Sequence, residues 1–165
     1  MDLRLELMPP VLDEDLVQRL AALADRLDGA YPGQYDEDLA EFNRLAGTTL
    51  LHHEFQGIYG GDTHEAWVRR TLYAHLIKRA EKVTAEELIE VARRAMEIGE
   101  SPDQSQAYMA IFDANVPLAG ASNLIFFPRD YDAATNTWGG GQPMGEYRPT
   151  PEQLVAWALE SPAAE

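Results

Sequence analysis

The seventeen residues from Phe112 to Pro128, FDANVPLAGASNLIFFP, constrain the fold more than any other part of this chain. Pro117 and Gly120 end the helix that precedes them, because proline removes a backbone donor and glycine favours turns. Asn123 and the apolar run 124–127 follow at once, and the run stops at a proline. This run is too short for a full helix. The segment therefore predicts one helix, a tight loop and a second helix reduced to a single turn.

Helix signals on both sides of this segment are clear. Thr84 and Glu87 have the spacing of a capping box, and Pro102 stands at the first position of the next helix. Thr150 opens a last helix in the same way. The helices predicted in this half cover residues 85–98, 102–115 and 150–160.

The segment 129–149 contains glycine, proline and aspartate without any helical or strand period. It therefore predicts a long loop, in which Gly139–Gly141 would be flexible. Tyr131 and Trp138 are expected to pin this loop to the helices.

The first half of the chain is also helical in pattern, with leucines recurring at intervals of three and four residues. The helices predicted there cover residues 13–28, 36–46 and 63–79. The inward face of the third is expected to consist of Trp67, Val68, Leu72 and Leu76. Residues 47–61 fit no helix and leave room for one short hairpin. The predicted fold class is all-α.

The composition is strongly acidic, with 28 Asp and Glu against 13 Lys and Arg and a formal net charge of -15. This charge disfavours direct binding to nucleic acid, whose phosphates attract cations. It suits either solubility or docking on a basic protein. The absence of cysteine excludes disulfides and thiolate chemistry. With no membrane-length apolar run and no signal-peptide pattern, we expect a cytoplasmic protein that does not enter membranes.

The order of elements in the second half resembles the colicin/pyocin (nuclease bacteriocin) immunity protein family. Four segments carry the resemblance: TAEELIEVARRAM, SPDQSQAYMAIFDA, SNLIFFP and TPEQLVAWALE. The most specific match is the gapless run 112–128, and the resemblance covers about residues 81–160. It implies a distorted four-helix bundle with a one-turn third helix, here in residues 81–165. Residues 1–80 would then be an N-terminal helical extension of unknown role, packed on the bundle.

The resemblance also implies a surface for a partner. Members of this family neutralise nuclease toxins without catalysis, by covering the surface beside the toxin's active site. The matching surface here is the helix 102–115 with the turn 123–128, and the partner would be a basic protein toxin, a nuclease. The residues assigned to partner binding are Asp103, Gln106, Met109, Asp113, Asn123, Phe126 and Phe127. Ser105 and Ala110 are expected on the same outward side. No catalytic residue, metal or cofactor is implied.

The turn differs from the family pattern at three positions. Asn123 stands in place of an acidic residue, and Phe126 and Phe127 stand in place of two tyrosines. The turn therefore offers apolar contacts where the family has a charge and two hydroxyl groups. A second hypothesis follows, in which the chain is a stand-alone structural or adaptor protein without a toxin. It would self-associate as a homodimer through Phe126, Phe127 and Trp138.

A third hypothesis concerns the histidines of the first half. His52, His53 and His64, with nearby carboxylates, are residue types that bind zinc. However, adjacent His52 and His53 point in different directions in any regular structure, and no HExxH spacing occurs. Capping, packing and solvation are the simpler roles for them. We therefore expect no metal site and no enzyme.

Overall fold

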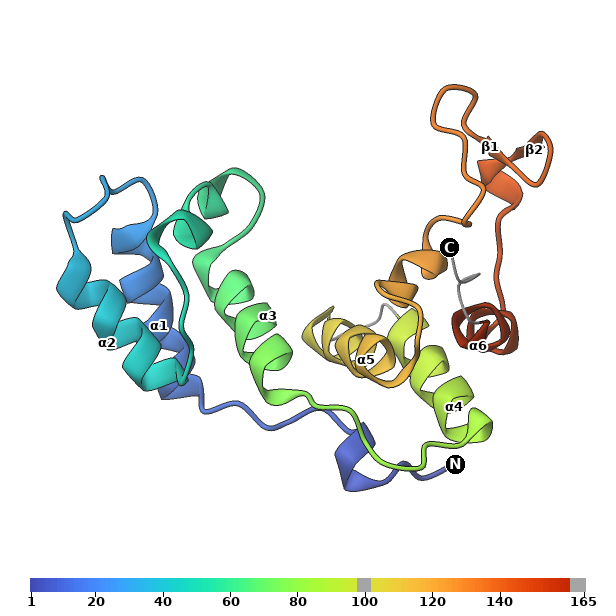
Figure 1. The fold of residues 1–165 in the computed structure, drawn as a ribbon, viewed down its shortest axis with the longest axis horizontal. Coiled ribbons are helices and arrows are strands. Elements are labelled where there is room, and N and C mark those ends of the chain that lie inside the picture. Colours follow the sequence, from blue (N-terminus) through green and yellow to red (C-terminus); the bar gives the residue numbers. More distant parts are fainter. Residues whose placement is uncertain (98–101, 161–165) are drawn as a thin grey trace. The chain divides into compact units, whose positions relative to one another are not determined.

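The computed structural model describes residues 1–97 and 102–160. The chain divides into two compact units (Figure 1). Residues Pro10–Leu76 form one of them, called here the N-terminal unit. Met1–Pro9 and Ile77–Glu165 form the other, the C-terminal unit. The first nine residues thus belong with the second half of the chain, and the boundary at Leu76 lies close to the residue 80 expected from the sequence.

The N-terminal unit is built from three helices and two short turns of 3-10 helix. They are α1 (Glu14–Leu27), α2 (Asp36–Ala46), η2 (His52–Phe55), η3 (Ile58–Gly60) and α3 (His64–Leu76). Helix α1 packs against both α2 and α3. Its N-terminus is capped by Asp13, whose side chain accepts hydrogen bonds from the amides of Asp15 and Leu16. Phe42 and Phe55 meet edge to face in the core, with ring centroids 4.9 Å apart.

The C-terminal unit is built on the helices α4, α5 and α6, and the short 3-10 helix η4 follows α5. Their bounds are α4 (Ala85–Met96), α5 (Pro102–Asn115), η4 (Ala121–Ile125) and α6 (Pro151–Leu159). Helix α4 packs against α5 and α6, and η4 packs against α5 and α6. Capping boxes form as predicted, Thr84 with Glu87 and Thr150 with Gln153. The core includes Phe112, Ile111, Val91 and Leu154, all fully buried.

The first residues of the chain join this core. A 3-10 helix η1 (Leu5–Leu7) precedes the N-terminal unit. Its last residue, Leu7, is fully buried in the same hydrophobic cluster as α4, α5 and α6. The Arg4 guanidinium also pairs with Glu87 at 2.7 Å. The segment Met1–Pro9 is therefore a structural part of the C-terminal unit.

The long segment before α6 is partly ordered by a small hairpin. Strand β1 (Thr137–Trp138) pairs antiparallel with β2 (Gln142–Pro143), and η5 (Met144–Glu146) follows. Gly139, Gly140 and Gly141 have φ values of 59°, 82° and 121°. Residues with side chains adopt such angles rarely, so the three glycines make the tight connection between the strands. The three glycines thus form a turn of defined backbone conformation within the long loop expected from the sequence.

The all-α class predicted from the sequence is confirmed, with two differences in detail. Residues 47–61 form the turns η2 and η3 and not a hairpin. Helix α3 ends at Leu76, and this last leucine is exposed instead of facing the core. None of the helices within residues 1–97 and 102–160 combines the length and the apolar character needed to span a membrane.

Candidate partner-binding surface

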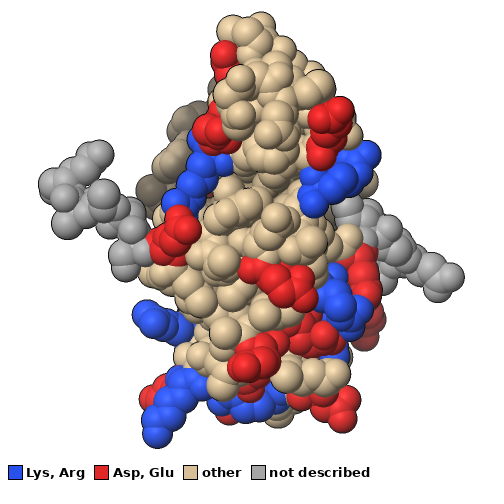
Figure 2. Space-filling view, turned by 90° about the vertical axis from the view of Figure 1, so that its right-hand side faces the viewer, with Lys and Arg blue, Asp and Glu red and all other residues tan. Residues whose placement is uncertain are grey.

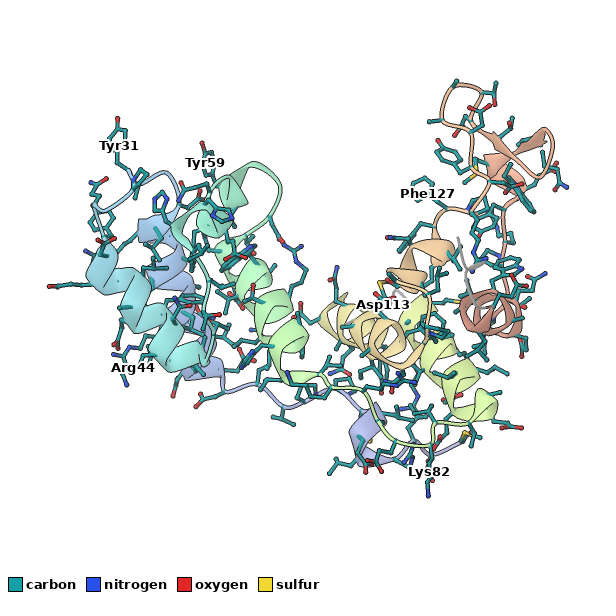
Figure 3. All side chains as sticks on the ribbon, in the orientation of Figure 1. Tyr31, Arg44, Tyr59, Lys82, Asp113 and Phe127 are labelled. Carbon is teal, nitrogen blue, oxygen red and sulfur yellow. The ribbon has the colours of Figure 1, made fainter. Side chains whose placement is uncertain are left out.

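The surface expected to meet a partner is carried by α5 and η4. Gly120 begins the turn with φ 64°, and the carbonyl oxygen of Asn123 accepts the amides of Phe126 and Phe127 at 3.0 and 2.8 Å. Leu124 is buried against α5 and α6, which fixes the turn on the core. The two phenylalanines that follow remain 44% and 51% exposed. Figure 3 shows the Phe127 ring standing clear of the ribbon at this point.

A second link joins the turn to the end of α5. The Asp113 carboxylate accepts one hydrogen bond from the Ser122 amide and one from the Ser122 hydroxyl, both at 2.7 Å. Asp113 was expected to face a partner. Its carboxylate also has a defined internal role, because these two hydrogen bonds hold η4 against α5.

The other residues assigned to the surface fall into two groups. Gln106 and Asn123 are exposed, and Asp103 and Met109 are half-buried. Ser105, expected on the outward side, is 3% exposed and donates a hydrogen bond to the carbonyl oxygen of Ala95 on α4. That expectation was wrong, because the small hydroxyl lets α5 approach α4 closely and still satisfies a helix-end carbonyl.

The segment 129–149 is attached to the turn by aromatic side chains. Tyr147 is buried and donates its hydroxyl hydrogen to the carbonyl oxygen of Leu124. Burial raises the pKa of Tyr147, and the negative charge of Asp130 raises it further. The Tyr131 ring lies 5.1 Å from the Phe127 ring. Sequence reasoning singled out Tyr131 but missed Tyr147, for which the sequence gives no local signal.

A pocket lies beside this attachment, between the turn, the hairpin and α6. Its volume is about 190 Å³, and it is lined by Leu124, Pro128, Arg129, Asp130, Trp138, Gly139 and Trp157. The Trp138 ring meets Tyr147 at 5.2 Å. The Trp138 indole N–H is buried, and no residue in the described part of the chain accepts a hydrogen bond from it. Sequence reasoning did not anticipate this pocket, because its walls come from segments far apart in the chain.

Charges are unevenly distributed on the side of the molecule that Figure 2 presents. Uncharged side chains cover most of its upper and central part, and acidic and basic side chains gather toward its edges and lower end.

His52, His53 and His64 lie in three different surroundings. His52 Nε2 lies 2.8 Å from the carbonyl oxygen of Ala30, and His53 is exposed. His64 Nε2 donates to the buried Asp28 carboxylate at 2.9 Å. Within the described residues, no three His, Asp or Glu side chains are grouped closely enough to bind one metal ion.

Asp28 is the centre of the hydrogen bonding in that unit. Its side chain, 1% exposed, also accepts the amides of Gly57 and Tyr59 at 2.9 and 3.0 Å. Burial raises the pKa of Asp28, but the hydrogen bonds from Tyr59, His64 and Gly57 outweigh it, so the pKa is below its usual value. The residue joins the end of α1 to η3 and α3.

No protein family model matches this chain, and neither a curated protein nor a solved structure is significantly similar to it. The fold and the surface define an all-α protein of two units. One of these units carries an exposed aromatic turn beside a small aromatic pocket.

Proposed function

We propose that this chain is a non-enzymatic, acidic binding protein that neutralises a basic protein toxin, a nuclease, like the immunity proteins that residues 81–160 resemble. The observation that carries the proposal is the state of Phe126 and Phe127. Both rings are about half exposed although they are adjacent, and both follow a turn fixed by hydrogen bonds.

Two adjacent exposed phenylalanines are unusual on a protein surface that serves only for solubility. Aromatic side chains are enriched at the centres of protein interfaces, where a few of them supply most of the binding free energy. The Asp113–Ser122 hydrogen bonds hold the turn before any partner arrives. Binding therefore requires little ordering of this segment, which favours affinity.

The net charge of -15 supports a basic partner. A nuclease carries a basic surface for its substrate, so an acidic protein approaches that surface faster than a neutral one. Bound there, it would block the entry of nucleic acid and repel phosphate groups. This mechanism comes from the family resemblance and needs no catalytic residue in the chain.

The test is inhibition of nuclease activity. The purified chain is mixed with nuclease domains of bacteriocins and with any nuclease encoded beside its gene. We expect tight inhibition of one of them and a rise in Kd of about 100-fold or more for the double variant Phe126→Ala/Phe127→Ala, because each change removes a candidate hot spot. Tyr31→Ala is the matched control, since Tyr31 is 79% exposed but lies in the N-terminal unit. Inhibition that the double variant keeps in full contradicts the proposed surface.

The same exposed rings support the second hypothesis, a self-associating adaptor. Sedimentation of the wild-type chain and of Phe126→Ala/Phe127→Ala separates the two functions. A wild-type dimer that the double variant dissociates, together with no inhibition of any nuclease, favours self-association. A monomer that inhibits a nuclease favours the toxin inhibitor.

A further inference from the structure

The pocket beside the turn has a composition that selects its ligand. Most of its wall is apolar and aromatic, made by Trp138 on β1, Trp157 on α6, Leu124 and Pro128. Its volume of about 190 Å³ is small for a cofactor or metabolite. It is large enough for one side chain of another protein.

In the carboxylate of Asp130, which lines this pocket, one of the two oxygens accepts a hydrogen bond from the described part of the chain and the other does not. Asp130 Oδ2 accepts a hydrogen bond from the Gly139 amide at 2.7 Å, which holds the hairpin turn. Across residues 1–97 and 102–160, no donor is bonded to Asp130 Oδ1 and no cation pairs with Asp130. One oxygen of an exposed carboxylate is therefore open to a positively charged group.

Arg129 also lines the pocket, but its guanidinium contacts the end of α6. Arg129 donates to the carbonyl oxygen of Trp157 at 2.6 Å and lies 3.4 Å from Glu160. These contacts direct its guanidinium to the end of α6, where Glu160 offsets its charge. Arg129 therefore supports the Trp157 wall and does not neutralise Asp130.

We propose that this pocket receives one lysine or arginine side chain of the basic partner. Such a side chain has a long apolar stem, which suits the Trp138, Trp157 and Leu124 walls, and a cationic end, which suits Asp130. Indole rings also attract cations through their faces. The inference rests on the proposed function and adds a polar anchor beside Phe127, because Pro128 both follows that ring and lines the pocket. Asp130 and Trp138 lie between SNLIFFP and TPEQLVAWALE, the last two segments that carry the resemblance to immunity proteins.

The experiment uses single amino-acid derivatives and needs no toxin. The chain has three tryptophans, so the variant Trp67→Phe leaves only the two pocket indoles as reporters. Nα-acetyl-lysine methylamide is titrated into this variant, with indole N–H resonances and fluorescence as readouts. Nα-acetyl-norleucine methylamide, which has a similar stem without the charge, is the comparison ligand. We expect the lysine derivative to shift both indole resonances and to bind about threefold to fivefold more tightly than the norleucine derivative.

Asp130→Asn tests the carboxylate directly. Asparagine keeps one oxygen for the Gly139 amide, so the hairpin is retained, and near-UV circular dichroism checks this. The variant should lose most of the preference for lysine, whereas the control Asp132→Asn should keep that preference. Equal binding of the two derivatives to the Trp67→Phe protein, or an unchanged preference in Asp130→Asn, overturns the proposal, as does the absence of any shift.

The two proposals fail separately. If the chain inhibits no nuclease but binds the lysine derivative, the toxin partner is contradicted and the pocket proposal stands. If the chain inhibits a nuclease but does not bind the lysine derivative, the pocket proposal is contradicted and the phenylalanine surface stands.

Discussion

The carboxylate of Asp113 holds Ser122 at two points, the backbone amide and the side-chain hydroxyl, each at 2.7 Å. This pair joins the last turn of α5 to the start of η4, the 3-10 helix that precedes Phe126 and Phe127. A charged acceptor makes stronger hydrogen bonds than a neutral one, and here both of its oxygens are used. The position of the aromatic turn therefore depends on Asp113, which lies nine positions before its partner Ser122 in the chain.

Replacing Asp113 with alanine should loosen the turn without removing any ring from the surface. We expect a loss of about 1–3 kcal/mol in the free energy of unfolding, because two donors of Ser122 lose their acceptor. Hydrogen exchange of the Phe126 and Phe127 amides should accelerate. Ser122→Ala removes only the hydroxyl bond and should give a smaller effect of the same kind. Unchanged exchange in Asp113→Ala would show that the two bonds to Ser122 do not hold the turn.

The sequence predicts the helices well because their signals are local. The Thr84 and Thr150 capping boxes each lie within four consecutive residues and form as expected. The break at Pro117 and Gly120 likewise depends on two residue types with strong backbone preferences. The short third helix follows from that break and from Pro128.

The candidate site was predictable only in part. The sequence did not show whether the Phe127 ring would be exposed or buried. A single helical turn is too short for hydrophobic periodicity to indicate which of its sides meets the core. The pocket joins Leu124, Trp138 and Trp157, which are separated by 14 and 19 positions in the sequence. The internal use of Asp113 also depends on a partner in another element. These are tertiary contacts, which no local pattern encodes.

Removing the hydroxyl of Tyr147 should weaken the attachment of the segment 129–149. In Tyr147→Phe the buried carbonyl oxygen of Leu124 loses its donor, for which we expect a cost of about 1–2 kcal/mol in chemical denaturation. Tyr131→Phe is the control, because the Tyr131 hydroxyl donates its hydrogen bond to the exposed Asn136. A cost for the control equal to that of Tyr147→Phe would contradict a specific role for the Leu124 bond.

Because of Tyr147, we also expect the free energy of unfolding to decrease at alkaline pH. Burial and the charge of Asp130 raise the pKa of Tyr147 above its usual 10.0, so the folded protein favours the neutral hydroxyl. This contribution is complete below about pH 10 and is lost as the pH rises through the folded-state pKa. Between pH 9 and 11 the wild-type chain should therefore lose stability relative to Tyr147→Phe. Parallel stability curves for the two proteins would disprove this.

In the N-terminal unit, Asp28→Ala removes the acceptor of three hydrogen bonds, from Gly57, Tyr59 and His64. We expect a loss of about 2–4 kcal/mol at pH 7, measured by urea denaturation followed through Trp67 fluorescence in a Trp138→Phe/Trp157→Phe background. Asp25→Ala is the matched control, since that carboxylate is 73% exposed and 3.7 Å from His64. It should change stability by less than about 0.5 kcal/mol.

The lowered pKa of Asp28 also determines the pH range in which this residue contributes to the free energy of unfolding. A carboxyl group whose pKa is lower in the folded state stabilises the fold above the unfolded-state value of 3.8. That stability is lost as the pH falls below this value toward the folded-state pKa. The difference between wild type and Asp28→Asn should therefore shrink below about pH 3.8. A difference that stays constant from pH 7 to pH 2 would show that the bonds do not require the charged form.

In the C-terminal unit, Glu90 should also make the free energy of unfolding depend on pH in acid, over a range that reaches down to about pH 2. Hydrogen bonds from Arg93 lower the pKa of Glu90 most. Burial opposes this effect, and a hydrogen bond from Arg94 adds to it, so that the pKa falls from 4.5 to about 2. Its stabilisation is therefore present above pH 4.5 and is lost as the pH falls toward 2. Because Arg93 is half exposed and screened by solvent, we expect Glu90→Gln to cost only about 1 kcal/mol at pH 7. The cost should disappear near pH 2, whereas the exposed control Glu86→Gln should have little effect at any pH. A cost for Glu90→Gln that persists at pH 2 would mean that the residue acts through packing and not through its charge.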